Sequence, residues 1–121
     1  MPIDWFNRLA IVLAGLLGAG GVAAAAAATH QGGALLGPLS LVAMTHAPAL
    51  LAVGLSGVTA LGLRAGALVV GFGALFFCAD LGTKHLWGVS LFPYAAPIGG
   101  SAMIAGWAIL GVSGLFLRAR S

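Results

Sequence analysis

Four long apolar runs, separated by short stretches that hold most of the polar residues, form the hydrophobic pattern of this chain. The pattern predicts helices over about 9–28, 39–63, 65–81 and 95–117. A membrane-spanning helix needs about 20 apolar residues. Because lipid admits only helices or closed barrels, and strand-like alternation is missing, we expect an all-α bundle of four transmembrane helices. Residues 1–121 then form a single transmembrane domain.

The first run also fits a second interpretation. Arg8, the apolar stretch after it and the alanines at 23–28 are together typical of a secretory signal. The core of a signal usually has about 7–15 apolar residues, whereas this stretch has about 20. The greater length favours a retained transmembrane helix.

Composition supports a membrane protein. Of the 121 residues, 61% are hydrophobic and 6% are charged, whereas about a quarter of an average soluble domain is charged. So little polar surface would not keep a monomer in solution. We therefore expect the lipid bilayer to be the main partner of the surface.

The few charges predict an orientation. If the four helices are correct, Arg8, Arg64, Arg118 and Arg120 lie on one side of the membrane and Lys84 lies on the other. Cytoplasmic loops carry an excess of Lys and Arg, so both termini are expected in the cytoplasm. Because orientation accounts for the net charge of +3, no nucleic-acid partner is expected.

Small residues predict how the helices pack. Lipid tails are as apolar as leucine, so transmembrane helices associate through close contact at small residues rather than through hydrophobic burial. The chain has 20 glycines, and small residues recur at four-residue spacing on every run. The predicted helix-packing glycines are Gly18, Gly57, Gly71, Gly99, Gly100 and Gly106.

The histidines are the main candidates for chemistry. His30, His46 and His85 all fall on the predicted outer side, and His46 lies within the second run. An ionisable residue inside a membrane suggests function by default. We therefore name a candidate polar pocket of His46, His30 and Asp80, with hydrogen-bonded structural histidines as the simpler alternative.

Other chemistries have little support in the sequence. Imidazole is a common metal ligand, but His-x-x-x-His and Cys-x-x-Cys spacings are missing, so we expect no metal and no cofactor. Asp80 and Lys84 have the four-residue spacing of a helical ion pair. Nucleophile-elbow, phosphate-loop and nucleotide-binding motifs are also missing. We expect a protein that is not an enzyme.

Two motifs carry a family resemblance. The run 92–100, Phe-Pro-Tyr-Ala-Ala-Pro-Ile-Gly-Gly, is followed by Ala105-Gly106-Trp107, and residues 45–50 read Thr-His-Ala-Pro-Ala-Leu. Together they resemble the YgdD/transmembrane-protein-256-like family of small four-span membrane proteins, also called domain of unknown function 423. Alanines replace the glycines that this family has before His30. The resemblance implies a multi-pass protein of the bacterial inner (plasma) membrane and no established activity.

Two functions remain open at this stage. The first is a non-enzymatic packing or accessory subunit, as a homo-oligomer or in a larger membrane complex, because packing residues are abundant and chemical groups are scarce. The second is a minimal transporter or small-ligand binder with an outward-facing pocket around His30, His46 and Asp80.

Overall fold

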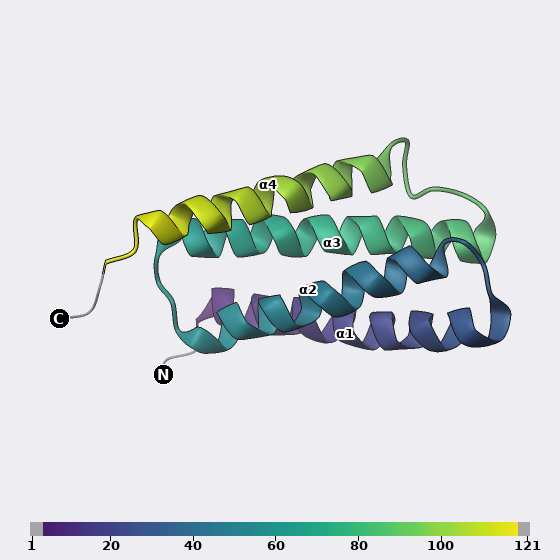
Figure 1. The fold of residues 1–121 in the computed structure, drawn as a ribbon, viewed down its shortest axis with the longest axis horizontal. Helices are drawn as coiled ribbons and strands as arrows, with labels where there is room; N and C mark the ends of the chain where they lie inside the picture. Colours follow the sequence, from purple (N-terminus) through teal and green to yellow (C-terminus); the bar gives the residue numbers. More distant parts are fainter. Residues whose placement is uncertain (1–3, 119–121) are drawn as a thin grey trace.

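The computed structural model describes residues 4–118, and in this range it is all-helical, without strands. The helices are α1 (Trp5–Gln31), α2 (Leu36–Ser56), α3 (Leu61–Trp87) and α4 (Ala95–Leu115). All four are long and apolar enough to cross a membrane. They run alternately up and down, so the start of α1 and the end of α4 lie at the same end of the molecule (Figure 1). The predicted all-α fold of four helices is confirmed.

Two of the predicted helix boundaries are wrong by six residues or more. The second helix ends at Ser56 rather than at Leu63, because Gly57 takes a left-handed backbone conformation with φ 74° that stops the helix. The third helix has 27 residues and ends at Trp87, although the hydrophobic pattern predicted it to be the shortest. Its last turns are polar, and the Asp80–Lys84 ion pair supports the helical conformation there.

The helices form two hairpins (Figure 1). We call α1 with α2 the first hairpin and α3 with α4 the second hairpin. Helix α3 lies between α4 and the first hairpin. The Cα atoms of α4 come within 8 Å of those of α3 but not of those of α1 or α2. Helix α4 therefore has one neighbour, whereas α3 has three.

Glycines bring the backbones together within each hairpin. In the second hairpin, a Cβ added at Gly99 would lie 2.7 Å from the carbonyl oxygen of Gly73, and one at Gly106 would lie 2.7 Å from the backbone nitrogen of Val70. In the first hairpin, a Cβ at Gly21 would lie 2.7 Å from Cγ of Met44. Real Cβ atoms do not come so close, so each hairpin depends on glycine at these positions.

The predicted packing glycines have different roles in the structure. Gly71, Gly99 and Gly106 lie at close contacts between helices, and Gly18 is in ordinary contact distance of Ala47. The other two predictions are wrong. Gly57 lies beyond the end of α2, and a Cβ at Gly100 would meet nothing within 4 Å, because it points away from α3.

Candidate functional site

The structure does not bring His30, His46 and Asp80 together in one pocket. Gly21 of α1 is level with Met44 of α2, and His46 is therefore close to that level. His30 lies nine residues farther along α1, which is roughly 14 Å at about 1.5 Å per residue. It is exposed at the end of α1, whereas Asp80 is fully buried in α3.

His46 bonds to a tryptophan on another helix. The indole Nε1–H of Trp107, on α4, donates a hydrogen bond of 3.0 Å to Nε2 of His46, on α2. Since an indole N–H can only donate, Nε2 carries no proton. Nδ1 then carries the proton and donates to the carbonyl oxygen of Val42 over 2.8 Å. The bond spans a groove over α3 that contains an apolar cavity of about 220 Å³ beside Trp107.

Asp80 holds the connection between α3 and α4. Its Oδ1 accepts a hydrogen bond of 3.0 Å from the backbone N–H of Leu91. Its Oδ2 lies 3.2 Å from Nζ of Lys84, which is the distance of an ion pair although the angle does not suit a hydrogen bond. Asp80 therefore ties the loop 88–94 to the end of α3, and its charge has a partner on the same helix.

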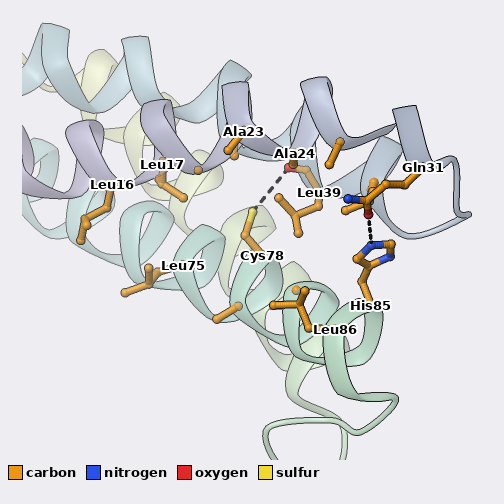
Figure 2. A pocket seen from close by; sticks show the side chains of 16 residues that line it. Leu16, Leu17, Ala23, Ala24, Gln31, Leu39, Leu75, Cys78, His85 and Leu86 are labelled. Carbon is orange, nitrogen blue, oxygen red and sulfur yellow. Dashed lines mark hydrogen bonds between the residues drawn. The ribbon is translucent and has the colours of Figure 1, made fainter. Parts of the chain in front are cut away.

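His85 bonds to a residue that the sequence analysis did not select. Its Nε2 lies 3.2 Å from Oε1 of Gln31, the last residue of α1. Figure 2 shows this pair at one end of a pocket of about 390 Å³, which is lined by α1, α2 and α3. Cys78 lies along the same pocket, with its thiol 3.7 Å from the carbonyl oxygen of Leu39.

The opposite end of the molecule has an ion pair between helices. Nη2 of Arg64, on α3, lies 2.6 Å from Oδ2 of Asp4, the N-cap residue of α1. The backbone N–H of Asn7 and the guanidinium of Arg64 hold the pKa of Asp4 below its ordinary value of 3.8. Nε of Arg64 also donates to the carbonyl oxygen of Val58, so this side chain joins α1, α3 and the loop before α3.

Asn7 supplies a buried polar contact inside the first hairpin. Its Nδ2 donates a hydrogen bond of 2.7 Å to the carbonyl oxygen of Gly54, on α2. Its side chain also accepts from the backbone of Asp4, completing a capping box that begins α1. Asn7 was not among the predicted site residues, although a lone amide at the start of an apolar run is a visible signal.

Several of the polar side chains join one hairpin to the other. Four contacts cross from one hairpin to the other: Asp4–Arg64, His46–Trp107, Gln31–His85 and Cys78–Leu39. The closest glycine contacts lie within the hairpins, whereas these directional contacts lie between them. Within residues 4–118, no group of three or more His, Cys, Asp or Glu side chains could hold a metal ion.

No family model, no curated protein and no solved structure matches the chain. The resemblance carried by residues 45–50 and 92–100 therefore stays a prediction from those motifs. The function has to be argued from the geometry.

Proposed function

We propose that this chain is a non-enzymatic, multi-pass protein of the bacterial inner membrane that acts as an accessory or self-associating subunit. Four helices long and apolar enough to cross a membrane support the location. Arg8 and Arg64 lie at the end of the molecule where α1 begins and α4 ends, and Lys84 lies at the other end. By the positive-inside rule, this distribution of charge supports an orientation with both termini in the cytoplasm.

The observation that carries this proposal is the single neighbour of α4. The helix leaves a row of exposed residues on its outer side, spaced by three and four residues in turn. Such spacing matches the face that one helix presents to another in a left-handed pair, and small side chains in the row allow close approach in lipid. The row consists of Ile98, Ser101, Ala105, Ala108 and Val112.

The polar groups support the same proposal. His46 and Asp80 are two of the three candidate pocket residues, and both make contacts that hold helices or loops in place. The distance between His30 and His46 gives no support to a shared pocket for a transported ligand. A structural role is therefore the better account of these residues.

Native mass measurement in a mild detergent tests the association. We expect a dimer or a larger assembly for the wild type, and a lower fraction of it for Ala105→Leu, because the larger side chain separates the helices. Ala26→Leu is the matched control, since Ala26 is exposed on α1, away from α4. A wild type that is strictly monomeric and purifies without other proteins would contradict the proposal.

Reporter fusions test the orientation separately. A reporter fused after Ser121, which lies outside the described residues, is expected to be active only in the cytoplasm. A reporter inserted in the loop 88–94 is expected to be active only in the periplasm. The reverse pattern would reject the proposed orientation without affecting the association.

A further inference from the structure

We propose that the pocket between α1 and α3 binds the single hydrocarbon chain of an amphiphile whose hydroxyl headgroup bonds to Gln31 and His85. The pocket is a groove of about 390 Å³. We call it the α1–α3 groove. Its walls are α1 and α3 and its floor is α2, where Leu36, Leu39 and Ala43 lie.

Contacts between α1 and α3 close the groove at both ends. Toward the start of the helices, a Cβ at Gly71 would lie 2.9 Å from Cδ1 of Leu13, so the two helices touch there. At the other end, Gln31 and His85 join them again over 3.2 Å. Between these points the walls stay apart, and a Cβ at Gly20 would meet nothing within 4 Å. The groove therefore has fixed ends and an empty middle.

Small residues face each other across this space without touching. Gly20, Ala23 and Ala27 line it from α1, and Ala79 and Gly82 line it from α3. In lipid, such residues normally let two helices close on each other. Walls that stay apart leave their atoms without partners, so they lose dispersion contacts unless another molecule fills the gap.

The dimensions select a single chain as that molecule. The groove extends along α1 from Leu16 to Gln31, which is roughly 22 Å at about 1.5 Å per residue. The empty space in the groove is at most about 910 Å³, which spread over roughly 22 Å gives a mean cross-section of at most about 41 Å². A helix about 10 Å wide covers about 80 Å². A helix from a second copy therefore does not fit, whereas one extended hydrocarbon chain does.

The polar end selects a hydroxyl headgroup. Since Oε1 of Gln31 can only accept, Nε2 of His85 must donate to it, which leaves Nδ1 of the neutral ring as an acceptor. Within the described chain, the amide nitrogen of Gln31 donates to no other group. Nδ1 faces Gly33, where an added Cβ would lie 3.4 Å from it. A headgroup with more than one hydroxyl, each able to donate and accept, suits an amide donor and a ring acceptor that lie apart.

The position of this pair suits the membrane. Helix α1 has 27 residues and is thus about 40 Å long, against a hydrocarbon core of about 30 Å. Its last residue, Gln31, therefore lies at the membrane interface, and the groove runs from there toward the middle of the bilayer. A headgroup at Gln31 and His85 leaves the hydrocarbon chain in the apolar layer.

Binding of monopalmitoylglycerol to the whole protein, measured by native mass spectrometry in detergent, tests the groove. We expect one molecule per chain, and about tenfold weaker binding to Gly20→Leu, because the new side chain displaces several methylene groups. Gly82→Leu, on the opposite wall, is a second variant with the same expectation. Gly111→Leu is the matched control, since a Cβ there also meets nothing within 4 Å and α4 does not line the groove.

Methyl palmitate, which has no hydroxyl, tests the headgroup. The wild type should bind monopalmitoylglycerol about tenfold more tightly than the ester, because the ester cannot donate a hydrogen bond. His85→Leu should lose this preference, and His30→Leu should keep it, because His30 does not line the groove.

Three results would overturn the proposal. They are equal binding by the wild type and both glycine variants, binding of a second copy of the chain in place of the amphiphile, and a hydroxyl preference that survives in His85→Leu.

Discussion

Trp107 and His46 are joined by a hydrogen bond of 3.0 Å although their helices, α4 and α2, have no Cα atoms within 8 Å of each other. Two large rings are needed to cover that separation, and they meet edge to face with centroids 5.8 Å apart. Among the described residues this is the only side-chain hydrogen bond that joins α4 to the first hairpin.

Trp107→Phe is expected to lower the free energy of unfolding slightly, because bonds between transmembrane helices are worth about 0.6 kcal/mol on average. His46→Leu should cost a similar amount, and its cost should largely disappear in the Trp107→Phe background. Reversible unfolding in mixed micelles measures all four proteins. Trp87→Phe is the control, since Trp87 is exposed at the end of α3. Additive costs would mean that the two rings do not stabilise each other.

Stability should fall at acid pH through Asp4. The pKa of Asp4 is lowered by the Asn7 backbone and by Arg64 from its ordinary value of 3.8, so the folded state favours the charged carboxylate. This contribution is fully present above the ordinary value and is lost as the pH falls through the lower folded value.

Asp4→Asn isolates this effect, because Asn also caps a helix but does not titrate. The thermal midpoint of the wild type should approach that of Asp4→Asn as the pH falls below about 4. Asp80 is present in both proteins, so its titration does not enter the comparison. A difference between the two midpoints that stays constant down to about pH 2 would show that Asp4 contributes nothing through its charge.

Adjacent glycines on α4 should respond oppositely to the same change. Gly99→Ala puts a methyl group 2.7 Å from the backbone of α3, and such overpacking typically costs about 1–3 kcal/mol. Gly100→Ala meets nothing within 4 Å and should be neutral or slightly stabilising. Unfolding free energies of the two variants check this, and equal values would mean that α3 and α4 pack less closely than described.

Replacing Lys84 alone should lower the free energy of unfolding more than replacing both members of its ion pair. Lys84→Met leaves the buried carboxylate of Asp80 without its cation. Such a loss typically costs about 3–5 kcal/mol when both partners are buried, and it should cost less here because Lys84 is partly exposed. The double variant Asp80→Asn/Lys84→Met removes the charge and keeps an oxygen that can accept from the N–H of Leu91. The double variant should therefore be more stable than Lys84→Met. The reverse order would show that the charge of Asp80 needs no partner.

The sequence predicted the helices better than the contacts of their polar residues. The apolar runs determine that four helices form, because a helix satisfies all its backbone hydrogen bonds in lipid without closing into a barrel. The Asp80–Lys84 pair was also predictable, because it depends on spacing within one helix. The hydrogen-bond partner of His46 was not predictable, since it depends on how far α4 lies from α2. Gln31 and Asn7 were missed for the same reason, because the partner of each lies on another helix.

The placement of polar contacts between the hairpins has a consequence for how the molecule can deform. Glycine contacts within a hairpin fix how its two helices pack, but they do not position one hairpin against the other. A hydrogen bond has a direction, and it is largely lost after a shift of about 1 Å. The contacts at Asp4, His46 and His85 therefore act as stops that set the tilt and height of one half of the protein against the other. Losing one of them should leave both halves folded and let them rock, with the largest opening at the end where the lost contact had been.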